Sequence, residues 1–343
     1  MANALLQLIM SVVIVLTVNT VGFKYNILIY SPNLKHKEKF KSKIINSGGM
    51  ALFIYFLVIN MFELQAINPY YLLFIISVFL VGILSDLKNI SASIRLLFIV
   101  ITTIIFVVLS DTLLINLKFD FTNNLLKNYF LISVLFTTLC IVILINGINF
   151  IDGVHGLAIF YCFTVLLLLN YFIYFVVGID TYVESGVALL PMLFILFLFN
   201  INEKLFFGDS GSYLVGCILA IYIIRITNIA EYAYPYLYAN FLIYPAFEVF
   251  FSIFRKILIN KNPYRPDKKH LHQLLQDFFV RKNFNLSKAK VISGISINIL
   301  VIIFGIIAIS FYENKYFLIL NIFIFAIFYC GSYLLLSRNI KIN

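Results

Sequence analysis

The segment 146–158, NGINFIDGVHGLA, brings several polar side chains together directly after a long apolar run. Asn146, Asn149 and Asp152 recur every third residue, so on a helix they fan across about 120° of one face. Gly153 and a second glycine flank His155 and let a ligand or another helix approach the backbone closely. A helix cap needs only one such residue, so the pattern indicates a ligand-binding face.

Two further segments place a carboxylate beside small residues at the end of an apolar run. In 203–216, EKLFFGDSGSYLVG, Asp209 lies between a glycine and a serine. Helix capping would explain the aspartate and the serine, but the flanking glycines also open space around the carboxylate, which favours a functional role. In 82–98, GILSDLKNISASIRLLF, Asp86 stands at a membrane boundary and Arg95 follows it.

The segment 255–282, RKILINKNPYRPDKKHLHQLLQDFFVRK, is strongly basic and holds His270 and His272 two residues apart. A metal-binding pair is the alternative, but neither a cysteine nor a third ligand at a standard spacing accompanies them. With Lys268 just before them, the histidines favour a cationic loop that holds phosphate. Upstream, Glu248 lies inside an apolar helix, where a charge costs about 2.5–3.5 kcal/mol on insertion scales and therefore indicates function.

These side chains belong to a chain that is otherwise apolar. Of its 343 residues, 62% are hydrophobic and 12% are charged, against about 25% charged residues in a soluble domain. Apolar runs of about 18–22 residues are long enough to cross a hydrocarbon core of about 30 Å as helices. We predict an all-α polytopic membrane protein with a single domain, 1–343, and exclude a soluble protein with an unusually large core.

About eleven membrane spans are expected, and the first is interpreted as a retained helix because no basic region of a signal peptide precedes it. The expected spans are 2–22, 48–62, 69–84, 94–110, 128–145, 156–177, 185–200, 211–227, 236–256, 289–311 and 315–336. The four cysteines all fall within these spans without metal-ligand spacing, so we interpret them as apolar packing residues.

The basic residues predict the orientation of the chain. All of the 25 lysines and arginines except Lys118, Lys127, Arg225 and Lys315 fall in one set of connecting segments, adjoining helix ends or the C-terminal tail. Those connecting segments are 23–47, 85–93, 146–155, 201–210 and 257–288. Because basic residues concentrate on the cytoplasmic side, we expect the N-terminus outside and the C-terminus in the cytoplasm. The net charge of +10 also suits an anionic substrate or lipid headgroup, and it does not indicate nucleic acid.

The polar clusters therefore lie on the expected cytoplasmic side of the membrane. Carboxylate and carbonyl oxygens are the ligands that Mg²⁺ prefers, together with substrate phosphates and water, and Mn²⁺ is an expected substitute. Arginine, lysine and histidine side chains at the same mouth would hold the remaining phosphate charge. The residues alone predict Mg²⁺-dependent phosphoryl transfer at the cytoplasmic membrane surface.

Five motifs, in order between residues 20 and 285, resemble those of the polyprenyl-phosphate N-acetylhexosamine-1-phosphate transferases of glycosyltransferase family 4. The family includes the phospho-muramoyl-pentapeptide transferase and the undecaprenyl-phosphate GlcNAc-1-phosphate transferases. NGINFIDGVHGLA is similar to its N-x-x-N-x-x-D-G-x-x-G-L motif, and FFGDSGSYLVG to its F-x-G-D-x-G-S-x-x-L-G motif. GILSDLKNIS with the following arginine resembles its aspartate-pair loop, YPAFEVFFSIFRK its P-x-x-[DE] helix, and RPDKKHLHQLL its histidine loop.

The resemblance implies a reaction and its partners. A sugar-1-phosphate, expected to be an N-acetylhexosamine-1-phosphate, would pass from a UDP-sugar to undecaprenyl phosphate in the inner membrane, with release of UMP. This step would begin a cell-envelope glycan such as O-antigen or capsule, at an active site facing the cytoplasm. The lipid bilayer is a further expected partner, and a second copy of the chain, in a homodimer, is a candidate partner.

The resemblance also implies residue roles. Asp209 matches the residue that binds Mg²⁺, with Asn149 at the same centre. The expected catalytic residues are Asp86, Asp152, Asp209, His270 and His272. The expected substrate-binding residues are Asn146, Asn149, Gly153, His155, Arg95, Glu248 and Lys268.

Two departures from the family pattern bear on the mechanism. The family usually has two aspartates where this chain has Ser85-Asp86, and often a histidine where it has Gln273. A phosphate monoester has a second pKa of about 6, so it is largely dianionic at neutral pH and hardly needs a base. We therefore favour direct attack by the lipid phosphate over a two-step scheme through an aspartate, with Asp86 positioning that phosphate or its proton.

Two other hypotheses stay open from the sequence. A transporter or flippase for a polyprenyl-linked glycan would place polar residues near the membrane midplane on broken helices, whereas here they crowd one face. A catalytically inactive homologue is suggested by Ser85, although Asp209, Asn149, Asp152 and the paired histidines are retained.

Overall fold

The computed structural model describes residues 2–29, 44–62, 68–88, 90–178, 186–230, 233–260 and 269–341. Within these ranges the regular structure is helical, apart from an isolated antiparallel bridge between Ile29 and Ile45. The all-α prediction is confirmed.

The helices fall into a long and a short group. The long helices are α1 (Ala2–Tyr25), α3 (Pro69–Lys88), α4 (Ala92–Ser110), α6 (Phe130–Ile151), α7 (Leu157–Tyr171) continued by the π-helix η1 (Phe172–Val177), α10 (Gly208–Ile229), α14 (Leu286–Ser310) and α15 (Lys315–Lys341). The short helices are α2 (Gly48–Phe62), α5 (Asp120–Asn128), α9 (Leu190–Ile201), α11 (Pro235–Phe241), α12 (Ile243–Leu258) and α13 (Leu271–Arg281).

The length and composition of the helices make this a multi-pass membrane protein. Eight helices of the described chain are long and apolar enough to cross a membrane, and the bent pair α11–α12 would make a ninth. The shorter apolar helices α2 and α9 would have to cross as well to give eleven. The count of eleven spans and the orientation of the termini stay predictions.

Several helix boundaries differ from those expected. α6 runs on to Ile151 instead of ending at 145, so Asn146 and Asn149 lie on its last turns. α10 begins at Gly208, earlier than expected. The helices α5 and α13 fall in segments expected to be connectors, because each is short and mixes polar with apolar residues.

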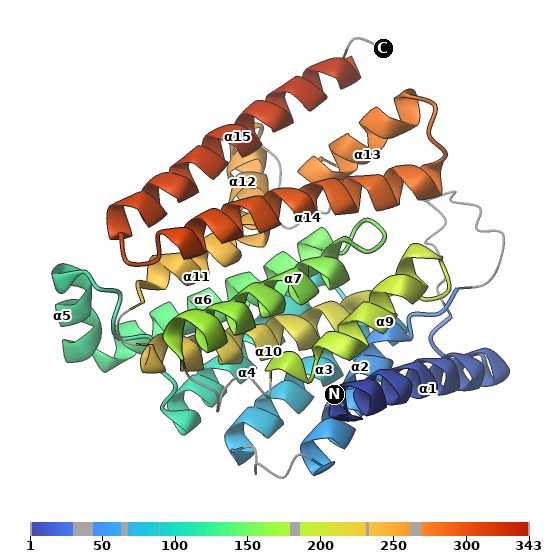
Figure 1. Cartoon of the computed structure of the whole chain (residues 1–343), viewed down its shortest axis with the longest axis horizontal. Coiled ribbons are helices and arrows are strands. Elements are labelled where there is room, and N and C mark those ends of the chain that lie inside the picture. The colour runs from blue at the N-terminus through green and yellow to red at the C-terminus, as the bar shows by residue number, and fades with distance from the viewer. Residues whose placement is uncertain are drawn as a thin grey trace.

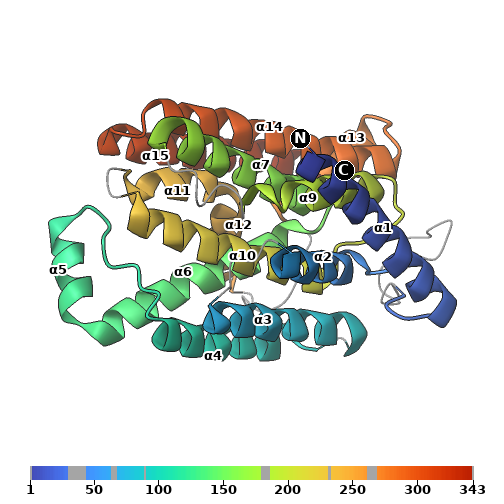
Figure 2. The same cartoon turned by 60° about the horizontal axis from the view of Figure 1, so that its bottom comes forward.

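Helix α10 occupies the centre of the molecule (Figure 1). Figure 2 shows α3 and α4 on one side of it and α14 and α15 on the other, while α5 and α13 lie at opposite ends. Two glycines let neighbouring backbones approach α10 closely. A Cβ on Gly82 of α3 would lie 2.5 Å from Ser210 Cα, and one on Gly216 of α10 would lie 3.0 Å from Ile145 Cα in α6. These approaches bring the ends of α3, α6 and α10 together.

The chain bends by 74° between α11 and α12. A buried amide pair holds the helices at this bend. Asn321 donates from Nδ2 to Asn240 Oδ1 at 2.8 Å and to the Phe304 carbonyl at 3.1 Å, and Asn240 donates to the Leu318 carbonyl at 3.1 Å. Buried amides need such partners, and these bonds join α11 to α14 and α15. The bend directs α12, which carries Glu248, towards the polar end of α6.

We predict that Gly82→Val destabilises the protein. The added side chain would overlap the α10 backbone, and overpacking of this kind costs about 1–3 kcal/mol. The apparent thermal unfolding midpoint of the detergent-solubilised variant should therefore be lower than that of the unsubstituted protein. Gly331→Val is the matched control, because a Cβ at Gly331 meets no atom within 4 Å. Equal midpoints for the two variants would contradict the close approach of α3 and α10.

Candidate active site

The N-terminus of α10 is capped by a side chain from another helix. Asp86 of α3 accepts hydrogen bonds from the backbone N–H groups of Asp209 at 2.9 Å and Ser210 at 3.0 Å, and from the Ser210 hydroxyl at 2.6 Å. A carboxylate at this position satisfies otherwise unpaired N–H groups and complements the helix dipole. The positive φ of Gly208, 75°, and the 2.8 Å distance from its would-be Cβ to Asp86 Oδ2 favour glycine here.

The loop before α10 is fixed from further sides. Phe206 donates its N–H to the Ile45 carbonyl at 2.9 Å, and the N–H groups of Gly48 and Gly49 bond the carbonyls of Phe206 and Phe207 at 3.0 and 3.1 Å. The first turn of α2 therefore packs against this loop. The cap and these bonds define where the Asp209 carboxylate points.

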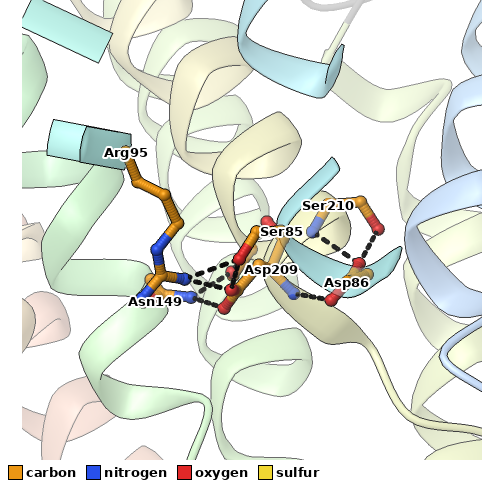
Figure 3. Close-up of polar contacts among 7 residues, drawn as sticks. Ser85, Asp86, Arg95, Asn149, Asp209 and Ser210 are labelled. Carbon is orange, nitrogen blue, oxygen red and sulfur yellow. Dashed lines mark hydrogen bonds and ion pairs between the residues drawn. The ribbon is translucent and has the colours of Figure 1, made fainter. Parts of the chain in front are cut away.

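Three side chains converge on that carboxylate (Figure 3). Asn149 of α6 donates from Nδ2 to Asp209 Oδ1 at 2.6 Å. The Ser85 hydroxyl donates to Asp209 Oδ2 at 2.6 Å, and Arg95 of α4 forms an ion pair with the same oxygen. Arg95 Nη1 also donates to Ser85 Oγ at 3.0 Å. Residues from four helices, α3, α4, α6 and α10, thus meet at Asp209.

The three polar residues Asn146, Asn149 and Asp152 lie in different surroundings. Asn149 Nδ2 also donates to Ser212 Oγ at 2.9 Å, whereas Asn146 donates to the Val142 carbonyl one turn back in its own helix. Asp152 follows the end of α6, and burial, with the negative charges of Asp209 and Asp86, raises the pKa of its carboxyl well above the ordinary value. A cation bound beside these carboxylates would favour the charged form of Asp152.

His155 packs against the segment that precedes α10. Its buried ring stacks on Phe206 with centroids 5.6 Å apart, and its Nε2 lies 3.8 Å from Glu203 Oε1. The substrate contact expected for His155 stays a prediction. Asn200, which the sequence motifs do not include, holds the same turn. It accepts from the Gly156 N–H at 2.6 Å and donates to the Leu205 carbonyl at 3.0 Å. The sequence signal that could have identified Asn200 is its position as a polar residue within the otherwise apolar helix α9.

Glu248 is buried and organises the histidine segment. Its Oε2 pairs with His270 Nδ1 at 2.8 Å, and its Oε1 accepts from the Leu271 N–H at 3.0 Å and the Tyr244 hydroxyl at 2.9 Å. A carboxylate so enclosed orients the neighbouring side chains, and the substrate contact expected for Glu248 stays a prediction. Gln273, where the family often has histidine, accepts from the His270 N–H at 3.4 Å in the first turn of α13.

His272 is fully buried beside the turn at Gly153. Its Nδ1 lies 3.2 Å from the Tyr244 hydroxyl and 3.6 Å from Glu248 Oε1. Its Nε2 faces Gly153, where an added Cβ would lie 2.8 Å away. Burial lowers the pKa of the His272 imidazole although Glu248 opposes the shift, so the ring is neutral at neutral pH. His272 therefore positions the turn at Gly153. Lys268, the other residue expected to bind substrate from this segment, lies outside the described residues.

The oxygen atoms around Asp209 suit Mg²⁺. Within the described ranges no three His, Cys, Asp or Glu side chains cluster as metal ligands. Mg²⁺, however, commonly takes one or two carboxylates and fills its remaining positions with water and substrate phosphates. Asp209 supplies a carboxylate, a rotation of the Asn149 amide would supply an oxygen, and the Arg95 guanidinium already occupies a cation position there. The donor set fits the ion.

Comparisons with known proteins agree with the motifs. Residues 68–227 match the sequence model of glycosyl transferase family 4. A stretch of 229 residues is 29% identical to the undecaprenyl-phosphate alpha-N-acetylglucosaminyl 1-phosphate transferase of Thermotoga maritima, covering 66% of this chain and 66% of that protein. A stretch of 169 residues is 31% identical to the decaprenyl-phosphate N-acetylglucosaminephosphotransferase of Mycobacterium leprae, covering 42% and 41%. The corresponding protein of Mycolicibacterium smegmatis is also 31% identical, over 42% and 40%.

The matched parts delimit what these relatives share with the chain. The chain spans about two thirds of the length of the Thermotoga protein and about two fifths of that of the mycobacterial ones. The family match includes the residues around Asp209 and ends before Glu248 and the two histidines. The resemblance drawn from the motifs is confirmed.

We predict that His272 makes folding stability depend on pH. The folded state holds the imidazole neutral between Gly153, Tyr244, Glu248 and His270, whereas the unfolded chain protonates it near the ordinary pKa of about 6.5. Lowering the pH through that value therefore favours the unfolded chain. The thermal midpoint should fall between about pH 7.5 and about pH 5.5, and fall less in His272→Gln. Equal falls in both proteins would contradict a buried neutral His272.

Proposed function

We propose that this chain, whose residues 68–227 match the sequence model of glycosyl transferase family 4, transfers a sugar-1-phosphate from a UDP-sugar to undecaprenyl phosphate and releases UMP. The observation that carries the proposal is the convergence of Ser85, Arg95 and Asn149 on Asp209, at the ends of apolar helices. An oxygen-rich, partly positive site at a membrane boundary suits a diphosphate and a lipid phosphate together.

The chemistry is a phosphoryl transfer. A non-bridging oxygen of the lipid phosphate forms a bond to the β-phosphorus of the UDP-sugar, and the bond from that phosphorus to the oxygen bridging to the α-phosphorus breaks. UMP leaves with the electron pair of that bond. The lipid phosphate is largely dianionic near neutral pH, since its second pKa is about 6, so the step needs no protein base.

The contacts of Asp86 support direct attack. Both of its carboxylate oxygens accept hydrogen bonds from the first turn of α10. An aspartate bonded in this way is a poor nucleophile, because attack would leave N–H groups of α10 unpaired. Asp86 is better interpreted as a positioning residue for Asp209 than as a group that contacts the lipid phosphate.

The remaining roles follow from position and charge. Mg²⁺, or Mn²⁺ in its place, held by Asp209 and Asn149 would offset the negative charge of the diphosphate. Arg95 would bind a phosphate oxygen through its guanidinium fork. Asp152 and Gly153 follow the end of α6, close after Asn149, and would contact the nucleotide. His272, which Glu248 and His270 hold in place, would keep the turn at Gly153 in position.

The location and substrate are also proposals. Basic residues concentrate on the site's side of the membrane, which supports a site facing the cytoplasm in the inner membrane, with the N-terminus outside. The names of the relatives favour N-acetylglucosamine as the first sugar to test. The product would begin a lipid-linked cell-envelope polysaccharide such as O-antigen or capsule.

We predict that the purified protein releases UMP from a UDP-sugar only when undecaprenyl phosphate and Mg²⁺ are both present. The assay would compare UDP-GlcNAc, UDP-GalNAc and UDP-MurNAc-pentapeptide. Asp209→Asn removes the carboxylate of the proposed metal site and should reduce the rate by at least about 100-fold. Asp111→Asn is the matched control, because Asp111 lies at the far end of α4 and should leave the rate unchanged.

The same assay separates the competing hypotheses. A transporter or an inactive homologue would release no UMP from any of the sugars. UMP release that is equal in Asp209→Asn and Asp111→Asn would show that the reaction does not depend on Asp209.

A further inference from the structure

The carboxylate of Asp209 is paired with a cationic side chain of the protein itself. Arg95 forms an ion pair with Oδ2, which also accepts the Ser85 hydroxyl, and Asn149 donates to Oδ1. The side chains of Arg95 and Asp209 are 18% and 27% exposed, so solvent reaches the pair and exchange is open to small ions. A divalent cation would have to share this carboxylate with a guanidinium.

The guanidinium of Arg95 uses little of its bonding capacity. Its hydrogen bonds to Asp209 and Ser85 both come from Nη1. Its Nε–H is buried and has no hydrogen-bond partner. A buried donor without a partner is costly, and a guanidinium fork is shaped for two oxygens of one phosphate or carboxylate. The free edge of Arg95 therefore points to an anion that binds here.

We propose that Arg95 occupies the cation position at Asp209 in the ligand-free protein and moves onto the substrate diphosphate when the divalent cation binds. This exchange rests on the proposed function, which supplies the metal and the diphosphate. After it, each cation faces its own anion: the metal faces Asp209 and the phosphates, and Arg95 faces a phosphate edge. The Asn149 amide turns at the same time to offer its oxygen in place of its NH₂ group.

Ser85 suits such an exchange. Its neutral hydroxyl bridges Arg95 and Asp209 without offering the arginine a second carboxylate. Arg95 can therefore leave Asp209 without breaking another ion pair. Because of this exchange, the metal should bind weakly in the absence of nucleotide and more strongly in its presence, and by linkage the metal should strengthen nucleotide binding equally.

The test measures binding of Mn²⁺ alone to the full chain in detergent, by the electron paramagnetic resonance signal of free Mn²⁺. Arg95→Gln removes the competing cation and should tighten Mn²⁺ binding by at least about 5-fold. Lys88→Gln is the matched control: it removes a positive charge from an exposed position on α3 near Ser85, and should change the affinity by less than about 2-fold. Arg95→Lys keeps a cation in place and should stay near the unsubstituted protein.

A second measurement must move in the opposite direction. With Mg²⁺ present, UDP-GlcNAc should bind Arg95→Gln more weakly than it binds the Lys88→Gln control, by about 10-fold, because the phosphate has lost its guanidinium. A general loss of structure would weaken both ligands, so tighter Mn²⁺ with weaker UDP-GlcNAc is specific to the exchange.

The outcomes distinguish the exchange from the proposed function. Mn²⁺ affinity in Arg95→Gln that equals or falls below that of Lys88→Gln would overturn the exchange, since Arg95 would then only orient Asp209. Mn²⁺ binding that survives unchanged in Asp209→Asn would overturn both the exchange and the proposed metal site. Loss of Mn²⁺ in Asp209→Asn with no effect of Arg95→Gln would leave the metal site standing and remove the exchange alone.

Discussion

The carboxylate of Asp86 on the N-terminus of α10 is the interaction on which the rest of the site depends. It accepts hydrogen bonds from two N–H groups and a hydroxyl of the first helical turn, and its negative charge interacts favourably with the positive end of the helix dipole. Because the cap comes from α3, it also fixes the distance between two membrane helices. Gly82 permits that distance, since any side chain there would meet the α10 backbone.

The cap determines what the neighbouring residues do. With its N–H group bound to Asp86, Asp209 presents its side chain to Ser85, Arg95 and Asn149 instead of capping its own helix. Both oxygens of Asp86 are occupied by these hydrogen bonds, so Asp209 is the acidic residue that we propose to lie beside the substrate. The proposed reaction needs one positioning carboxylate, Asp86, and one metal-binding carboxylate, Asp209. A third carboxylate is not required, which explains why a serine can occupy position 85.

The sequence was sufficient for the features that depend on local pattern. Long apolar runs predicted the helices. Asp209, Asn149 and Arg95 could be expected near one another because each lies at the helix end predicted to face the cytoplasm, which is the first turn of α10 and of α4 and the last turn of α6. Features that depend on tertiary contacts were not accessible. The cap on α10 comes from a residue 123 positions earlier, and the burial of Glu248 and His272 follows from the bend before α12. Lys268 and the loop around it lie outside the described residues.

In the proposed reaction Asp86 caps α10 and the lipid phosphate attacks the β-phosphorus directly. The stereochemistry at the β-phosphorus tests it most directly, with a UDP-sugar that carries one sulfur in place of a non-bridging oxygen on that phosphorus. A single displacement predicts inversion of configuration in the lipid-linked product. Retention of configuration would show two successive displacements through a protein nucleophile and would contradict the account.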